Sequence, residues 1–134
     1  LQSRWMKWLN VKFLDTNILA YAFYSNEHTD KCQAAITEGG VTDTFNLIEA
    51  FHIIEKETGS RERAQSIIKG LLKSNVEIVG VDVNTVFEAI KRVGRSRLSI
   101  FDSVHYACAF INNCNSILSY DKDFDRLDIP REEP

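Results

Sequence analysis

Apolar residues along the chain recur with two different periods, and these periods predict an alternation of short strands and longer helices. Four short apolar runs are typical of strands: residues 11–14, 41–43, 76–81 and 116–121. Segments with apolar residues three and four positions apart predict helices over residues 17–25, 28–36, 44–58, 60–74, 82–94 and 99–113. Because strands and helices alternate, we expect an α/β fold: a three-layer α/β/α sandwich with a central parallel sheet.

Residues that end or cap helices support these boundaries. Gly59 and Gly94 are expected to end two helices, while Ser60 and Asp82 are expected to cap the helices that start beside them. No repeat, low-complexity tract or Pro/Gly-rich linker divides the chain. The sequence therefore predicts a single domain over residues 11–134, preceded by an N-terminal extension over residues 1–10 whose role the sequence leaves open.

Four acidic residues occupy positions where a core-building pattern favours apolar side chains. Asp15 and Asp121 end two predicted strands, whereas Glu49 and Asp102 lie in strongly apolar helices. In open parallel sheets, ligands bind at the carboxyl ends of the strands, so the two strand-end acids point to that edge. Each acid taken alone could instead form a turn or stand near a helix start, and we expect the apolar helix around Glu49 to be largely buried.

Together the four carboxylates are hard to explain by structure alone. Burying an unpaired carboxylate is costly, and converging carboxylates raise one another's pKa. No lysine or arginine lies between Leu14 and Asp30 to neutralise them. A hard divalent cation resolves the conflict, and Mg²⁺ or Mn²⁺ takes the oxygen ligands that such a cluster offers. An acidic site of this kind suits phosphodiester cleavage, because the ion acidifies a water molecule and offsets charge on the phosphate.

Composition narrows the function classes. The chain of 134 residues is 44% hydrophobic and carries a net charge of −3, so it lacks the global positive field of a passive nucleic-acid binder. Its three cysteines form no metal-ligand spacing, which argues against zinc and favours free thiols in a reducing, cytoplasmic setting. The apolar runs fall short of the roughly 20 residues of a membrane span. A local basic run could hold an RNA backbone or be solvated surface; its arginines are Arg92, Arg95 and Arg97.

The ordered motifs "FLDTNIL", "TFNLIEAFHII", "SIFDSVHYACA" and "LSYDKDF" resemble the PIN-domain ribonuclease family, most closely its small toxin-type, VapC-like members. The resemblance extends from about Val11 to Leu127 and implies Mg²⁺- or Mn²⁺-dependent cleavage of RNA, a cognate antitoxin and a homodimer. Carried over motif by motif, the catalytic and metal-binding acids would be Asp15, Glu49, Asp102 and Asp121. The supporting polar positions would be Asn17 and Ser119.

Other functions stay open at this stage. A phosphotransfer protein, either a receiver domain or a haloacid-dehalogenase-like phosphatase, also places an aspartate at a strand end, although position 17 is Asn where the dehalogenase pattern has Asp. A non-catalytic PIN-like module that only binds RNA or protein is a further alternative. His105 could face the site or simply be packed, and Asp123 and Asp125 read as solvated turn acids, of which Asp125 could assist the site.

Overall fold

A computed structural model of the chain describes residues 10–134 and contains one five-stranded sheet in which every pairing is parallel. The strand order is β3-β2-β1-β4-β5, and the strands are β1 (Lys12–Leu14), β2 (Gly40–Asp43), β3 (Val76–Val79), β4 (Ser116–Leu118) and β5 (Arg131–Glu132). Four of them were predicted. The edge strand β5 was not, because two charged residues carry no apolar alternation. The expected N-terminal extension lies, except for residue 10, outside the described residues.

The helices follow the predicted order. They are α2 (Thr16–Tyr21), α3 (Thr29–Glu38), α4 (Thr44–Thr58), α5 (Arg61–Leu72), α6 (Val83–Val93) and α7 (Ile100–Ile111), with a short 3₁₀ turn, η1 (Lys122–Phe124), after β4. The expected caps are present: Ser60 accepts a hydrogen bond from the Arg63 backbone N–H, and Asp82 accepts one from Thr85. Gly59 ends α4 with a φ of 67°, in the left-handed region that glycine adopts without strain. None of the described helices is long and apolar enough to cross a membrane.

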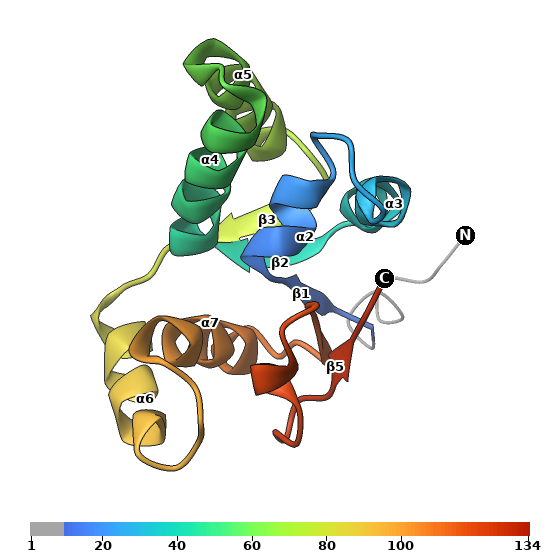
Figure 1. Cartoon of the computed structure of the whole chain (residues 1–134). Coiled ribbons are helices and arrows are strands. Elements are labelled where there is room, and N and C mark those ends of the chain that lie inside the picture. Colours follow the sequence, from blue (N-terminus) through green and yellow to red (C-terminus); the bar gives the residue numbers. More distant parts are fainter. Residues whose placement is uncertain (1–9) are drawn as a thin grey trace.

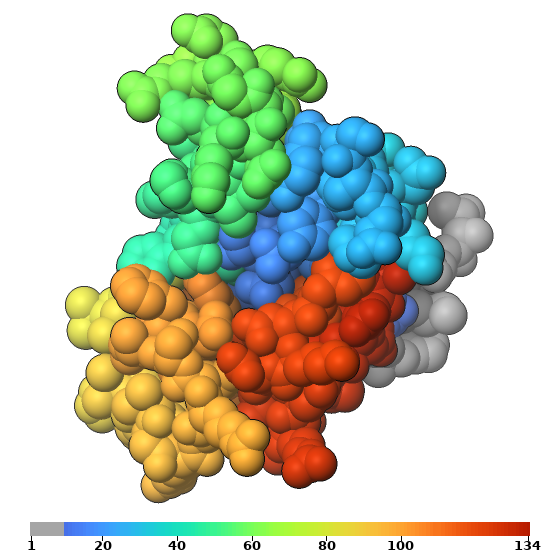
Figure 2. Space-filling model, viewed as in Figure 1, coloured from blue at the N-terminus to red at the C-terminus, as the bar shows by residue number. Residues whose placement is uncertain are grey.

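Alternation along the strands separates two cores, one on each face of the sheet. In β1, Phe13 packs into a core with the aromatic and small residues of α7, while Leu14 packs into a second core with α2 to α5. Ile117 and Leu118 of the neighbouring β4 divide between the same two cores. The sheet is therefore covered on both faces, which confirms the three-layer α/β/α sandwich (Figure 1). Helices α4 and α5 project beyond the sheet as an arm (Figures 1 and 2).

Strand register brings the carboxyl ends of the inner strands together. Phe13 pairs with both Val41 of β2 and Ile117 of β4, so the residues two positions later, Asp15, Asp43 and Ser119, follow in the same register. Since side chains alternate along a strand, these three point to the same face as Phe13, the face that α7 covers. The fold thus places two acids and a hydroxyl between the edge of the sheet and the first turns of α7.

Candidate active site

Asp15 is a buried carboxylate at the centre of this edge. Its side chain is 6% exposed, and Ser119 Oγ donates a hydrogen bond of 2.7 Å to Asp15 Oδ2. The Asp15 backbone N–H donates to the Leu118 carbonyl, which fixes the turn from β1 into α2. Burial raises the pKa of Asp15, and the hydrogen bond from Ser119 and the nearby charge of His105 oppose that rise. The carboxylate is therefore oriented by the fold but only partly compensated.

Three further aspartates form a compact oxygen-rich cluster. One carboxylate oxygen from each of Asp102, Asp121 and Asp123 lies within 4.8 Å of the other two. Asp102 is held in the first turn of α7, whose N-cap residue Ser99 accepts a hydrogen bond from the Asp102 backbone N–H. Asp121 caps η1 by accepting a hydrogen bond of 2.9 Å from the Asp123 N–H. These local contacts aim acids from two distant parts of the chain at one point.

The cluster is under electrostatic strain. Burial, followed by the negative charges of Asp15 and Asp121, raises the pKa of Asp102 to about 6. No lysine or arginine within residues 10–134 forms an ion pair with Asp15, Asp102, Asp121 or Asp123. The four acids therefore share a site whose negative charge the described part of the chain compensates only through a nearby histidine.

Glu49 lies beside the cluster and is held differently. Its side chain is 43% exposed, so the expectation of a largely buried helix was wrong for this part of α4, and the adjacent Ile48 is also exposed. The Thr16 hydroxyl donates a hydrogen bond of 2.7 Å to Glu49 Oε2, and His105 Nε2 lies 3.7 Å from Glu49 Oε1. These contacts, led by that with His105, lower the pKa of Glu49. Glu49 is consequently a fixed, ionised carboxylate at neutral pH.

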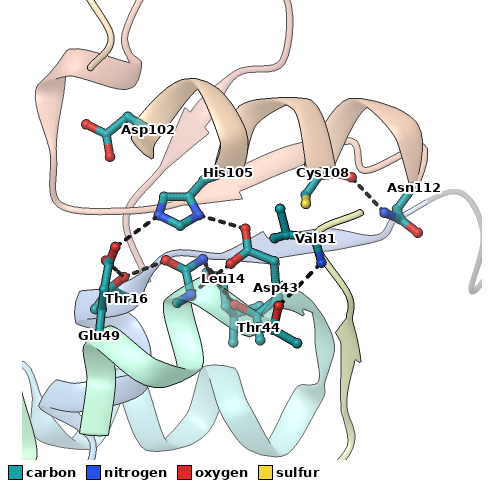
Figure 3. A network of polar contacts seen from close by, with 12 residues as sticks. Leu14, Thr16, Asp43, Thr44, Glu49, Val81, Asp102, His105, Cys108 and Asn112 are labelled. Carbon is teal, nitrogen blue, oxygen red and sulfur yellow. Dashed lines mark hydrogen bonds and ion pairs between the residues drawn. The ribbon is translucent and has the colours of Figure 1, made fainter. Parts of the chain in front are cut away.

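A buried ion pair supports Glu49 from behind (Figure 3). Asp43, at the end of β2, is fully buried, and its Oδ2 atom lies 2.7 Å from His105 Nδ1 on α7. Burial alone would lower the pKa of His105, but the hydrogen bond to Asp43 and the nearby carboxylate of Glu49 raise it to about 10. The imidazole is therefore protonated at neutral pH. Its Nδ1 donates to Asp43, whereas Nε2 faces Glu49 at 3.7 Å without a hydrogen bond, and an imidazolium has no free nitrogen with which to act as a general base.

The other residues singled out in the sequence fall into different places. Asn17 is partly buried, and its side chain makes no hydrogen bond within residues 10–134. Arg92 pairs with Glu88 and lies over the ring of Phe110, whereas Arg95 and Arg97 are exposed in the loop after α6. Asp125 forms an ion pair with Arg131 at 2.6 Å and is not one of the clustered aspartates.

The structure thus assembles a site that differs from the expected quartet. Asp15, Asp102 and Asp121 converge, and Glu49 stands beside them through His105. Asp123, interpreted from sequence as a solvated turn acid, joins the cluster because the one-turn η1 helix folds it back toward Asp121. Asp43 was missed, although it follows the same pattern as Asp15: an acid at the end of a strand that leads directly into a helix.

Comparisons with known proteins agree with this architecture. The family model described as the PIN domain matches residues 12–130. No curated protein sequence matches the chain significantly. The VapC20 toxin of Mycobacterium tuberculosis, which cleaves the sarcin-ricin loop, superposes with a TM-score of 0.77 at 18% identity, covering 92% of this chain and 99% of that chain.

Two other solved structures are similar. A toxin–antitoxin complex from Klebsiella pneumoniae has a TM-score of 0.68 at 14% identity, over 87% of this chain and 92% of that chain. VapBC2 of Rickettsia felis, bound to a DNA fragment of its promoter, has a TM-score of 0.67 at 18% identity, covering 92% of this chain and 98% of that chain. The fold is that of these toxin structures. The family model that matches is neither a receiver domain nor a haloacid-dehalogenase-like phosphatase. The chain belongs to the PIN-domain family.

Proposed function

We propose that the protein is a divalent-metal-dependent ribonuclease and the toxin of a toxin–antitoxin pair. The observation that carries this proposal is the group of carboxylates from Asp102, Asp121 and Asp123, with Asp15 beside them, at the carboxyl edge of a parallel sheet. Membership of the PIN-domain family and the toxin folds that the chain matches support the same function. The substrate we propose is RNA, as the resemblance of the sequence motifs to toxin-type PIN-domain ribonucleases implies.

The donor atoms fit Mg²⁺ or Mn²⁺. All of them are carboxylate oxygens, the ligands that hard cations prefer, and the three cluster oxygens are close enough to share one ion. The ion would be held by Asp102, Asp121 and Asp123, with Asp15 as a further ligand or anchor. When bound, such an ion supplies positive charge that acidifies a water molecule and offsets charge developing on the phosphate.

The chain's own residues would orient and charge the site. Ser119 fixes one oxygen of Asp15, and the His105 imidazolium keeps Glu49 ionised and in place. Since His105 donates rather than accepts, proton acceptance near the substrate falls to the carboxylates. Of these, Glu49 is the half-exposed carboxylate that lies beside the cluster and outside its set of ligands. We assign it the role of orienting the attacking water.

The proposed partners need surfaces of their own. The backbone of the RNA substrate would contact Arg92, Arg95 and Arg97. An antitoxin would cover the acidic cluster, for which an inserted arginine is the matching side chain.

A homodimer could form through α6, which exposes Val83, Phe87 and Ile90 along one side. An apolar stripe on a single helix can pair with its own copy about a twofold axis. Three free cysteines suit a cytoplasmic site of action.

Cleavage of a fluorescent RNA tests the function. The protein is incubated with the RNA in Mn²⁺, in Mg²⁺ and in EDTA, alongside the variants Asp15→Asn and Asp102→Asn. We expect cleavage that needs either metal and is lost in both variants. Cleavage that persists in EDTA or in both variants would overturn the proposal, and RNA binding without cleavage would identify a non-catalytic module.

Metal binding tests the composition of the cluster separately from activity. Titration of the protein with Mn²⁺ in a calorimeter is expected to show weaker binding for Asp123→Asn than for the wild type. Asp125→Asn is the matched control. Asp125 lies two residues after Asp123, but its carboxylate forms an ion pair with Arg131. Equal Mn²⁺ affinities for the Asp123 variant and the wild type would remove Asp123 from the ligand set.

A further inference from the structure

A basic pocket lies between the loop that follows α6 and the segment that follows η1. Its volume is about 530 Å³, within the range of pockets that hold small molecules. Figure 2 shows yellow-orange and red atoms of these parts of the chain touching at the lower end of the molecule. Resting on the proposed ribonuclease function, we propose that this pocket binds one nucleotide of the substrate RNA, away from the bond that is cut.

The charge of the pocket is positive although the chain as a whole is acidic. Four cationic side chains and two carboxylates line it: Lys91, Arg92, Arg95, Arg126, Glu88 and Asp128. Glu88 is occupied by Lys91 at 3.0 Å and by Arg92 at 2.5 Å. Arg95 and Arg126 form no ion pair within residues 10–134. These two guanidinium groups, from separate segments, are therefore available for a phosphate group.

The remaining lining residues suit the rest of a nucleotide. Leu98, Leu127 and the ring of Tyr106 add apolar surface to the basic walls. Tyr106 is fixed there, because its hydroxyl accepts a hydrogen bond from the Ile129 backbone N–H. A nucleotide could place its phosphate on the arginines and its sugar and base against this apolar surface, so it would contact both the basic and the apolar residues. A free inorganic anion would use only the arginines.

The pocket is also in line with the acidic cluster. Tyr106 lies one helical turn after Asp102, so both residues occupy the same face of α7, about 6 Å apart along its axis. On the opposite side, Asp123 of the cluster is followed three residues later by Arg126 of the pocket. An RNA strand lying on the acids would therefore continue between the same two segments into the pocket.

Binding of labelled single-stranded RNA tests this inference without depending on cleavage. Fluorescence anisotropy is recorded with Mn²⁺ in an Asp15→Asn background, over a series of salt concentrations. Arg95→Gln and Arg126→Asn are compared, with Arg126→Lys as a charge-retaining variant. Asparagine is chosen because Arg126 has a φ of 64°, a left-handed conformation that asparagine tolerates. Arg63→Ser, an exposed arginine on the distant α5, is the control for loss of charge.

We expect Arg95→Gln and Arg126→Asn each to raise the Kd roughly fivefold and to reduce the slope of log K against log salt by about 0.7, the value for one phosphate contact on a single strand. Arg126→Lys should restore most of the affinity, and Arg63→Ser should leave it unchanged. The inference would be overturned if Kd and salt slope are unchanged in both pocket variants. It would also be overturned if the Asp15→Asn protein with an intact pocket does not bind RNA. If binding depends on the pocket but the wild type cleaves no RNA, the ribonuclease proposal fails and the pocket stands.

Discussion

Replacing Asp102 by asparagine is expected to stabilise the metal-free protein while weakening its response to metal. In the fold, burial and the charges of Asp15 and Asp121 make ionisation of Asp102 unfavourable, and its pKa rises from 3.8 to about 6. At neutral pH the folded state therefore holds a carboxylate that the unfolded chain accommodates at no cost. Asparagine keeps the shape of the side chain and removes the charge.

The size of the effect follows from the pKa. A rise in the pKa of Asp102 from 3.8 to about 6 corresponds to a cost of about 3 kcal/mol for holding the ionised carboxylate in the fold, before solvent screening is considered. Because Asp102 is only partly buried, solvent screening leaves roughly 1 kcal/mol of stabilisation. For a chain of this length, that free energy raises the melting temperature by about 3–5 °C.

The pH dependence gives the sign an independent check. Below pH 3.8 the Asp102 carboxyl is protonated in both states, so the advantage of asparagine is absent. It grows between pH 3.8 and 6, as the wild type loses stability, and is complete above pH 6. Melting curves in EDTA from pH 3.5 to 8 measure it, with Asp128→Asn as an exposed, charge-matched control.

Addition of Mn²⁺ completes the test. A ligand that binds only the folded state raises the melting temperature, so the wild type should gain more from Mn²⁺ than the Asp102 variant. A variant that melts below the wild type in EDTA would refute the reasoning, because Asp102 would then be paired in the metal-free fold. A gain that does not change with pH would refute it as well.

Three further predictions concern the buried ion pair and the start of β2. Replacing His105 by alanine leaves Asp43 buried without its partner and should lower the free energy of unfolding by about 3–5 kcal/mol in urea titrations at pH 7; an unchanged midpoint would contradict the pair. Because the pKa of His105 is raised from 6.5 to about 10, its stabilisation is complete below pH 6.5 and should be lost as the pH rises toward 10, in the wild type but not in the alanine variant. Replacing Gly40 by alanine should lower the melting temperature, since its φ is 147° and a Cβ would collide with the Lys12 carbonyl oxygen, whereas Gly70→Ala, which meets open space inside α5, should raise it slightly.

Much of the fold was predictable because its signals are local. Short apolar runs located the four strands β1 to β4, and caps such as Ser60 and Asp82 located helix starts to within about one residue. The edge strand β5 escaped because its pairing with β4 depends on the approach of distant backbone and not on its own two side chains. The order of the strands in the sheet likewise depends on tertiary packing and not on local sequence signals.

The site was predictable where an acid interrupts an apolar pattern, as Asp15 and Asp102 do. Asp123 stands in a polar stretch where nothing marks it, and only the turn of η1 brings it to Asp121. Asp43 and His105 were not linked because 62 positions separate them and neither position alone indicates an ion pair. Once that pair is known, the half-exposed Glu49 no longer needs a metal to explain its charge.

The hydrogen bond between Asp15 and Ser119 joins residues 104 positions apart, and the cluster needs acids that lie later still. During synthesis, β1 and the arm of α4 and α5 leave the ribosome long before β4 can pair with β1 and carry Asp121 and Asp123 into place. Under the proposed function, a growing or C-terminally truncated chain is therefore no nuclease. RNA would then be exposed to the activity only after the last strands have been made, and an antitoxin would bind the completed fold.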